Sequence, residues 1–396
     1  MKNIKDFDFA GKKALIRVDF NVPQDQNGKV TDNTRILAAL PTIQKVISDG
    51  GIAILMTHLG RPNGEVNKKY SLQPVVEEIS KALNHSVQFI DDSVGEKVKE
   101  KVNSLSQGDI LLLENLRFYP EEEKGDENFA KKLADLGDVY INDAFGTAHR
   151  KHASTAVISQ FFPENKMFGF LMEKELEAIN KVMNSGKKPV TAILGGAKVS
   201  SKITIIENIL PKIDNLIVGG GMAFTFIKAK GGKVGNSLVE YDKLELALEI
   251  IEECKAKNVN LYLPVDVVAT KEFDNDAETK EYDIYEIPDD WMGLDVGEKT
   301  SDLFHDVVLS SKTILWNGPL GVFEMSNFSK GTQKLGDSIA EATELGAFSL
   351  VGGGDSVAFV KQFGYDDKVS YVSTGGGAML ESLEGKELPG VAAIHS

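Results

Sequence analysis

Short, nearly continuous apolar runs recur through the first part of the chain and alternate with segments of helical periodicity. The apolar runs lie at 13–18, 52–57, 87–90, 110–113 and 139–141. Between them, apolar residues recur at helical spacing over 34–48, 72–83 and 127–136. Because strands that are buried on both faces do not alternate with polar residues, this succession predicts an α/β domain with a parallel sheet covered by helices.

The second part of the chain repeats this pattern, and here most strands run directly into glycine. The predicted strands are 190–194, 215–218, 261–263, 313–316, 348–351 and 371–373, and the glycines are 195–196, 219–221, 318, 352–354 and 375–377. A single glycine after a strand is usually only a turn. Several at one sheet edge leave backbone N–H groups free for phosphates at helix N-termini, so the pattern predicts a nucleotide site. The acidic segment 271–290 is interpreted as a solvated excursion outside this site.

A helix predicted within 170–189 connects the two parts. Met172, Leu176, Ile179 and Met183 form one apolar face. Glu173 lies in the first turn, Gly186 is predicted as the C-terminal cap, and Pro189 cannot continue the helix. The predicted organisation is an N-terminal lobe at 1–169, an interdomain helix at 170–188 and a C-terminal lobe at 189–387.

Composition excludes several classes of protein. The chain has 396 residues, 42% of them hydrophobic, and a net charge of −15, which argues against binding nucleic acid through its phosphates. The single cysteine, Cys254, fits a reducing compartment. No apolar run is long enough for a signal peptide or a membrane span, so we expect a cytoplasmic protein.

All five arginines lie before residue 151, although the chain contains 39 lysines. Arginine is hard to replace where a planar fork binds carboxylate or phosphate. We therefore predict an anion pocket that contains His58 and four of the arginines, namely Arg35, Arg61, Arg117 and Arg150. Arg17 is interpreted as a structural residue that pairs with a buried carboxylate. His149 and His152 are not interpreted as a zinc site, because no third ligand has suitable spacing.

Two features of the second lobe bear on phosphate binding. Lys198 and Lys202 lie four residues apart and are predicted on one face of a helix that opens at GGAKVSSK. Cations in the first turns of a helix are unfavourable because of the helix dipole, unless a polyphosphate is bound there. Asp355 fits two interpretations, a helix N-cap or a ligand that holds Mg²⁺ against phosphates.

The motifs of other classes of nucleotide protein are missing from the chain. The chain has no GxxxxGK[ST] loop and no HRD or DFG motif, which speaks against P-loop NTPases and protein kinases. A nicotinamide dehydrogenase is disfavoured because GxGxxG is missing after the first strand of either lobe. A two-lobed anion receptor without enzymatic activity is the binding-protein alternative, and the Asp355 loop speaks against it.

The whole chain resembles the phosphoglycerate kinase family. The matching stretches are RVDFNVP at 17–23, HLGRP at 58–62, ENLRF at 114–118, NDAFGTAHRKHAS at 142–154, LGGAKVSSK at 194–202, GGGMAFTF at 219–226, WNGPLGVFE at 316–324, GGGDS at 352–356 and STGGGA at 373–378. The resemblance implies two Rossmann-like lobes, with the tail 388–396 packing back on the first. It implies reversible transfer of a phosphoryl group between 1,3-bisphosphoglycerate and ADP, giving 3-phosphoglycerate and ATP, in a monomer whose two lobes close about a hinge. The expected partners are these small molecules with Mg²⁺, and neither nucleic acid nor a membrane.

The resemblance also assigns roles to individual positions. For the phosphoglycerate it implies Asp19, Asn21, Arg35, His58, Arg61, Arg117 and Arg150. For the nucleotide it implies Gly196, Lys198, Lys202, Gly220, Gly293, Asn317, Glu324, Gly353, Gly354, Asp355 and Ser356, with Glu324 toward the ribose and Asp355 on Mg²⁺. For catalysis it implies Arg35, Lys198, Gly354 and Gly377. Ser201 departs from the aspartate that many members carry there, which puts in doubt any contact of that position with the first lobe.

Overall fold

The computed structural model describes residues 2–396, and these fall into two compact units. The first unit comprises residues up to Leu176 together with Glu387–Ser396, and the second comprises Glu177–Lys386. The chain crosses from the first unit to the second within helix α6 (Phe170–Met183).

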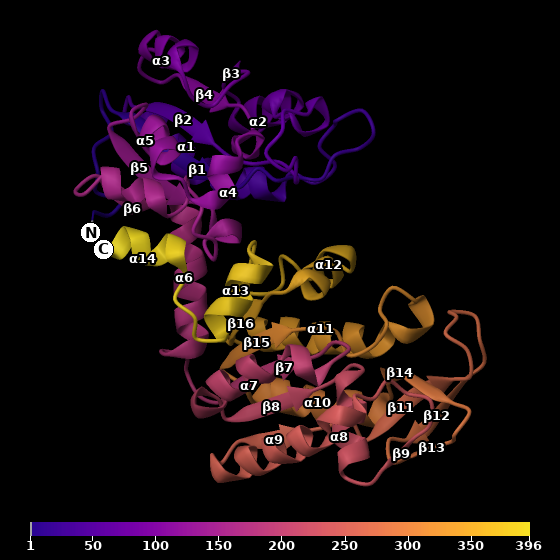
Figure 1. Ribbon diagram of the computed structural model, residues 1–396. Coiled ribbons are helices and arrows are strands. Elements are labelled where there is room, and N and C mark those ends of the chain that lie inside the picture. Colours follow the sequence, from indigo (N-terminus) through magenta and orange to yellow (C-terminus); the bar gives the residue numbers. More distant parts are fainter. Residues whose placement is uncertain (1) are drawn as a thin grey trace. The chain divides into compact units, whose positions relative to one another are not determined.

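The first unit contains a six-stranded sheet in which all paired strands are parallel (Figure 1). Its order is β3-β4-β2-β1-β5-β6, with β1 at Lys13–Val18, β2 at Ile52–Met56, β3 at Val87–Ile90, β4 at Ile110–Leu113, β5 at Val139–Asp143 and β6 at Lys166–Phe168. Its helices before α6 are α1 (Thr34–Ser48), α2 (Val76–Leu83), α3 (Glu96–Asn103), α4 (Pro120–Lys124) and α5 (Glu127–Ala134).

The central strands of this sheet are buried on both faces, which explains why their sequences are uninterrupted apolar runs. Ile16 of β1 and Leu55 of β2 share one fully buried cluster with Ile43 of α1 and Ile79 of α2. The strands predicted at 13–18, 87–90 and 110–113 and the helix predicted at 34–48 are confirmed with their bounds. β6 was not predicted, because its three residues are too few to show a pattern.

The C-terminal helix α14 (Pro389–His395) belongs to the first unit and lies beside β6 (Figure 1). The Gly390 N–H donates to the Ala148 carbonyl at 2.8 Å, and Asn142 Nδ2 donates to the Gly390 carbonyl at 3.2 Å. His395 stacks edge-on against Phe168, with ring centroids 5.4 Å apart. The tail therefore supports the loop that follows β5.

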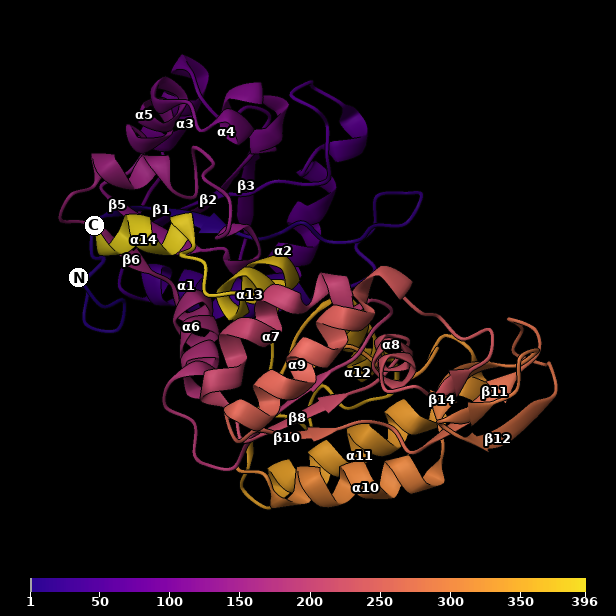
Figure 2. The same cartoon turned by 60° about the horizontal axis from the view of Figure 1, so that its bottom comes forward.

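The second unit contains a second six-stranded parallel sheet, of order β10-β8-β7-β15-β16-β17. Its strands are β7 (Val190–Leu194), β8 (Asn215–Val218), β10 (Asn260–Tyr262), β15 (Thr313–Asn317), β16 (Phe348–Val351) and β17 (Tyr371–Val372). Its helices are α7 (Ile203–Ile209), α8 (Met222–Ala229), α9 (Leu244–Ala256), α10 (Glu298–Ser310), α11 (Lys330–Glu344), α12 (Gly354–Gln362) and α13 (Gly376–Leu383). Helices α10 and α11 run side by side along one face of the sheet (Figure 2). The predicted α/β class with mostly parallel sheets is confirmed.

Two smaller sheets were not predicted. An antiparallel sheet of order β12-β11-β14 contains β11 (Asp266–Thr270), β12 (Thr279–Asp283) and β14 (Met292–Val296), and β9 (Lys233–Val234) pairs with β13 (Glu286–Ile287). The segment 271–290 is mostly exposed, as expected of a solvated excursion, but it contains the strands β12 and β13, which the sequence did not indicate. β12 is almost entirely exposed, so its sequence lacks the apolar alternation by which a half-buried strand is recognised.

The predicted end of α6 is also wrong. The helix ends at Met183, and the N–H groups of Asn184 and Ser185 both return to the Asn180 carbonyl. Gly186 is not a left-handed cap. A Cβ at this position would lie 2.5 Å from the Lys181 carbonyl oxygen and 2.9 Å from Thr313 Oγ1, so a larger residue would clash with the last turn of α6 and with this side chain.

Candidate functional site

Four adjacent strands of the first sheet carry the predicted anion-binding residues in the loops that follow them. These strands are β4, β2, β1 and β5, which form the centre of the sheet. Asp19 and Asn21 follow β1, His58 and Arg61 follow β2, Arg117 follows β4, and Arg150 follows β5. Because parallel strands end at the same edge, one edge gathers residues from four distant parts of the sequence.

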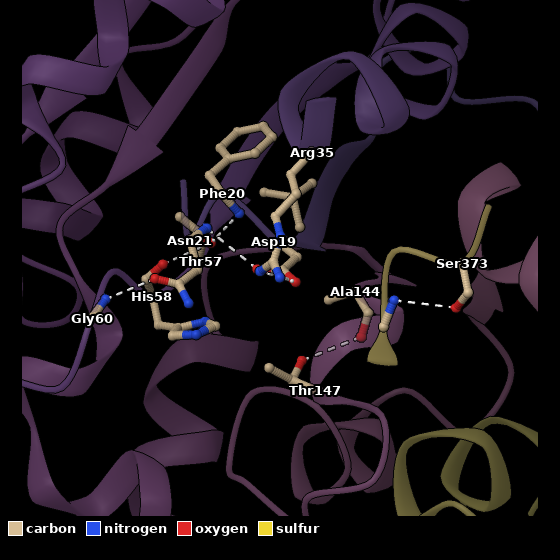
Figure 3. A network of polar contacts seen from close by, with 12 residues as sticks. Asp19, Phe20, Asn21, Arg35, Thr57, His58, Gly60, Ala144, Thr147 and Ser373 are labelled. Carbon is tan, nitrogen blue, oxygen red and sulfur yellow. Dashed lines mark hydrogen bonds and ion pairs between the residues drawn. The ribbon is translucent and has the colours of Figure 1, made fainter. Parts of the chain in front are cut away.

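Arg35 is held at this edge by a carboxylate. It is the second residue of α1, and its Nη1 lies 3.0 Å and 2.9 Å from the two carboxylate oxygens of the buried Asp19 (Figure 3). The structure gives the Nε and Nη2 donors of Arg35 no bond to any residue within 2–396. Arg35 is therefore oriented by one nitrogen and keeps its remaining donors for a ligand.

The loops after β1, β2 and β4 are tied together by hydrogen bonds. Figure 3 shows those between the loops after β1 and β2. The Asn21 side-chain oxygen accepts the Gly60 N–H at 2.9 Å, and Thr57 Oγ1 accepts the Phe20 N–H at 2.9 Å. Arg117 Nη1 donates to the Gly60 carbonyl at 3.1 Å. The anion-binding edge is thus a cross-linked set of loops, in which Asn21 and Arg117 position their neighbours.

Burial, together with the cationic environment of this edge, keeps two histidines neutral. Burial lowers the pKa of His58 well below its usual range, and the nearby Arg17, Arg117 and Arg35 lower it further. Burial followed by the field of Arg117 lowers the pKa of His152 to about 3. Of these arginines, Arg17 contacts His58 directly, with its Nη2 at 3.2 Å from His58 Nδ1.

Arg61 and Arg150 are exposed, in contrast to the other predicted residues of this edge. Arg61 follows Gly60 in the tied loop. The carbonyl of Arg150 accepts a hydrogen bond from Thr155 Oγ1 at 2.9 Å, and the charge of Arg150 contributes to the low pKa of His152. Both side chains therefore stand at the rim of the anion-binding edge.

In the second unit, glycine loops press against one another at the corresponding edge of the sheet. A Cβ at Gly195 would lie 2.1 Å from the Pro319 carbonyl oxygen, and one at Gly220 would lie 2.6 Å from the Gly196 nitrogen. Gly196 itself has a positive φ of 109° and open space where a side chain would be. These positions need glycine either for loop packing or for exposing backbone to a ligand.

A cavity of about 470 Å³ lies beside these loops, entirely within the second unit. Five predicted nucleotide-site residues line it: Gly196, Gly220, Gly293, Glu324 and Asp355. Its walls are otherwise mainly apolar and include Phe224, Met292 and Leu320. Phe273, from the segment interpreted as outside the site, also lines the cavity. An apolar slot that is also lined by glycine backbone and by the carboxylates of Glu324 and Asp355 suits a planar base joined to a sugar and phosphates.

Several other predicted residues form a polar network next to the cavity. Lys202 Nζ donates to the side-chain oxygen of Asn317, and Asn317 Nδ2 donates to the Gly352 carbonyl at 2.7 Å. Ser356 Oγ accepts the Gly318 N–H at 2.6 Å. Burial lowers the pKa of Lys202, while Asp355 opposes the shift. Asn317 therefore holds Lys202 and the loop after β16, and Ser356 holds the loop after β15.

The prediction that Lys198 and Lys202 share one helical face is wrong. Lys198 has extended backbone and precedes a short 3₁₀ turn (Val199–Ser201), and Lys202 stands between this turn and α7. The exposed Ser201 hydroxyl donates back to the Lys198 carbonyl at 2.8 Å. The dipole argument against cations on a shared helix therefore does not apply to Lys198.

The structure excludes one of the two interpretations of Asp355. The N-cap of α12 is Gly353, with a positive φ of 96°, and Asp355 is the second residue of the helix. Its carboxylate lines the cavity and makes no hydrogen bond to the part of the chain that the structure describes. The helix-cap interpretation is therefore wrong. A single unpaired carboxylate suits Mg²⁺, which binds through one or two carboxylates together with substrate phosphates.

Gly354 and Gly377 lie at helix N-termini, as the first residue of α12 and the second residue of α13. Both are exposed, and a Cβ at Gly354 would meet open space. Backbone N–H groups at such positions carry partial positive charge, so each is suited to an anionic oxygen. Among the helices of residues 2–396, none is long and apolar enough to cross a membrane.

Comparison with known proteins gives one consistent match. The sequence profile of the family described as phosphoglycerate kinase matches residues 4–386. A protein named phosphoglycerate kinase from Porphyromonas gingivalis is 54% identical over 416 residues, covering 99% of this chain and 99% of that protein. One of the same name from Chloroherpeton thalassium is 52% identical and covers 100% of this chain and 99% of that protein.

Two solved structures agree with this match. The structure of phosphoglycerate kinase from Coxiella burnetii aligns with a TM-score of 0.91 at 41% identity, covering 99% of this chain and 98% of that one. The crystal structure of phosphoglycerate kinase from Pyrococcus horikoshii aligns with a TM-score of 0.83 at 33% identity, covering 100% of this chain and 98% of that one.

The buried His152 should make stability depend on pH. Its folded pKa is about 3, whereas a histidine in an unfolded chain titrates near 6.5. Between these values the unfolded state binds more protons, so the unfolding free energy falls as the pH falls. Between pH 7 and pH 5 we expect the unfolding free energy of the native protein to fall by about 2 kcal/mol more than that of His152→Gln. Denaturant titrations at both pH values measure this difference.

The matched control is His85→Gln, because His85 is exposed. This control should lose as much unfolding free energy between the two pH values as the native protein does. Equal losses for the native protein and His152→Gln would contradict the assignment of a neutral, buried His152.

Proposed function

The chain belongs to the phosphoglycerate kinase family, and we propose that its first unit binds the phosphoglycerate while its second unit binds the nucleotide. The reaction is reversible phosphoryl transfer between 1,3-bisphosphoglycerate and ADP, which gives 3-phosphoglycerate and ATP in glycolysis. The observation that carries the proposal is the division of chemistry between the units. The arginine-rich edge belongs to one unit, and the glycine-lined cavity belongs to the other.

The arginine-rich edge matches a small acid with two anionic ends. Arg35, with two unbonded donors, and Arg117 can each approach a carboxylate or a phosphate through a planar fork. Asn21 and Asp19 also have oxygens that can accept the substrate hydroxyl, because each stands at the same edge. The exposed Arg61 and Arg150 supply positive charge at the rim. This charge offsets the repulsion of an anionic substrate by a chain of net charge −15.

The cavity of the second unit accounts for the nucleotide. Its apolar walls take the base, Glu324 takes ribose hydroxyls, and Gly196 and Gly220 bring backbone close to the phosphates. Lys202 and the N-terminus of α12 at Gly353 and Gly354 complete a cationic end. The exposed Lys198 is free of the Lys202 network and can follow the transferred phosphoryl group.

Asp355 is proposed as the protein ligand of Mg²⁺ carried by the nucleotide. The metal, when bound, neutralises phosphate charge and leaves the chain to bind and orient the nucleotide. We also propose that the protein acts as a monomer.

The mechanism needs no general base. In the direction that consumes ATP, the acceptor is a carboxylate, which is already ionised at neutral pH. Catalysis then consists of aligning the two ligands and stabilising the charge of a loose phosphoryl transition state. Arg35, Lys198 and the N-termini at Gly354 and Gly377 are proposed to supply this stabilisation.

A coupled assay with ATP, Mg²⁺ and 3-phosphoglycerate tests the function directly. ATP consumption should depend on 3-phosphoglycerate and stop when Mg²⁺ is chelated. A dehydrogenase or a receptor without enzymatic activity would give no such turnover.

The role of Arg35 is tested by Arg35→Lys, which keeps the charge but removes the planar fork. We expect kcat to fall by on the order of 10²–10⁴, approaching the effect of an arginine finger, because a lysine ammonium lacks the separate nitrogens with which the planar fork can bond Asp19 and the phosphoryl oxygens in fixed directions. Steady-state kinetics measure the change, and thermal unfolding should be nearly unaltered. A native turnover number in this variant would exclude Arg35 from the transition state.

The role of Asp355 is tested by Asp355→Ala with calorimetric titration of each ligand. MgADP binding should weaken, because the variant lacks the only proposed protein ligand of the metal. Binding of 3-phosphoglycerate should be unchanged, because its residues belong to the other unit. Asp337→Ala is a matched control at a carboxylate that lies outside the cavity. Normal MgADP affinity in Asp355→Ala would contradict the role in metal binding.

Transfer between ligands on different units requires the two reacting groups to meet. Reacting atoms must approach to roughly 3–3.5 Å with water excluded. We propose that the units close together about the ends of α6 when both ligands are bound, because only contacts specific to the closed state can shift the equilibrium. The radius of gyration from solution scattering should fall clearly with 3-phosphoglycerate and a MgATP analogue together, and less with either alone. An unchanged radius with both ligands would argue against closure.

A further inference from the structure

The guanidinium of Arg17 is fully buried and fixed by three contacts. Its Nε donates to Ser154 Oγ at 2.8 Å, and its Nη1 donates to the Val18 carbonyl. Its Nη2 lies 3.2 Å from His58 Nδ1. Each nitrogen of the planar group therefore faces a different partner, and the side chain has no exposed surface. The interpretation of Arg17 as a partner of a buried carboxylate omits the contact with His58.

A carboxylate does balance the charge of Arg17, but it acts through a serine. The fully buried Glu122 accepts the Ser154 N–H at 3.0 Å and also the Ser154 hydroxyl. Tyr140 donates its hydroxyl to the Ser154 carbonyl at 2.7 Å. Ser154 is thus held from three directions while it accepts from Arg17, and the guanidinium cannot rotate away from His58 without breaking this network.

The chemistry of the two groups determines which nitrogen of His58 carries hydrogen. A guanidinium has only donors and stays protonated in proteins. The His58 nitrogen that faces it must therefore be an acceptor, which makes Nδ1 the unprotonated nitrogen. In a neutral imidazole the hydrogen then lies on Nε2. A protonated ring would direct an N–H at the Arg17 N–H, which agrees with the lowered pKa of His58.

The Nε2 atom is available to a ligand. Within the described part of the chain, Nε2 makes no hydrogen bond. It is also not a fully buried atom, so the 3% of His58 that remains exposed includes Nε2. Asp19, Asn21 and Arg35 lie at the same edge of the sheet as His58 (Figure 3).

We propose that Arg17 is a positioning residue that holds His58 as the Nε2–H tautomer, so that His58 presents a neutral, directed N–H donor to the anionic substrate. This inference rests on the proposed function of the edge. The opposite tautomer would direct a lone pair at the substrate oxygens and would leave Nδ1–H against the guanidinium. Arg17 thereby determines the specificity of the edge for an acceptor oxygen without contacting the substrate.

The tautomer can be observed directly by long-range ¹H–¹⁵N correlation NMR on protein labelled at its six histidines. The His58 signals are assigned by their loss in His58→Gln. We expect an unprotonated Nδ1 and a protonated Nε2 at every pH between about 5 and 8, and a shift of the Nε2 signal when 3-phosphoglycerate is added. A protonated Nδ1, or a ring that titrates in this range, would overturn the inference whether or not the protein has the proposed activity.

The dependence on Arg17 is tested by Arg17→Met, with Tyr140→Phe as a control that removes a different hydrogen bond to Ser154. In Arg17→Met we expect a second His58 species and a KM for 3-phosphoglycerate raised about 10-fold, with a smaller change in kcat. Tyr140→Phe should lower stability but leave both the tautomer and the KM unchanged. If Arg17 were only structural, Arg17→Met would leave the tautomer of His58 unchanged and would not affect KM more than kcat.

A second pair of variants answers the question if Arg17→Met does not fold. In His58→Gln the amide nitrogen can occupy the place of Nε2, whereas in His58→Asn it can occupy only the place of Nδ1. We expect His58→Gln to bind 3-phosphoglycerate about 10-fold more tightly than His58→Asn. Equal affinities would overturn the inference. If the tautomer is as stated but the substrate leaves the His58 signals unmoved, the binding role of His58 is wrong, and the coupled assay still decides the activity.

Discussion

The constraint on which both sites depend is that all strands of each large sheet are parallel and therefore end at one edge. A loop that follows a strand at this edge cannot place its polar residues elsewhere. In the first unit the four adjacent strands β4, β2, β1 and β5 deliver cations and amides to one edge, and in the second unit β8, β7, β15 and β16 deliver glycines to another. The position of each site follows from the strand order, and its chemistry depends on the type of residue that follows each strand.

This constraint explains why so much could be predicted from the sequence. Strands buried on both faces are recognisable as apolar runs, and the residues after them could be assigned to one edge without knowledge of the strand order. The concentration of arginine in a lysine-rich chain then indicated which loops are proposed to bind anions. Arg35 is an example in which residue type and position together led to a proposed role, whereas for Asp355 they left a helix cap and a metal ligand open.

The remainder could not be predicted, because it depends on contacts between segments distant in sequence. The small sheet β12-β11-β14 has an exposed strand with little apolar pattern, so Phe273 was not expected in the cavity wall. The extended backbone at Lys198 follows from loop packing between glycines, which spacing along the chain does not reveal. Arg17 could be recognised as buried from its strand, but its link to His58 requires the pairing of β1 with β2.

Arg17 and Arg35 differ in how completely they are bonded, and this difference fits their depth. Arg17, with no exposed surface, has a partner at each guanidinium nitrogen, because an unsatisfied buried charge is costly. Arg35, partly exposed, bonds Asp19 through one nitrogen only. A fully paired arginine would have to break a bond to receive a substrate, and an unpaired one would lose side-chain entropy on binding. Partial pairing orients Arg35 before the substrate arrives and leaves its other donors unbonded, so an acidic chain keeps a cationic edge with few charges.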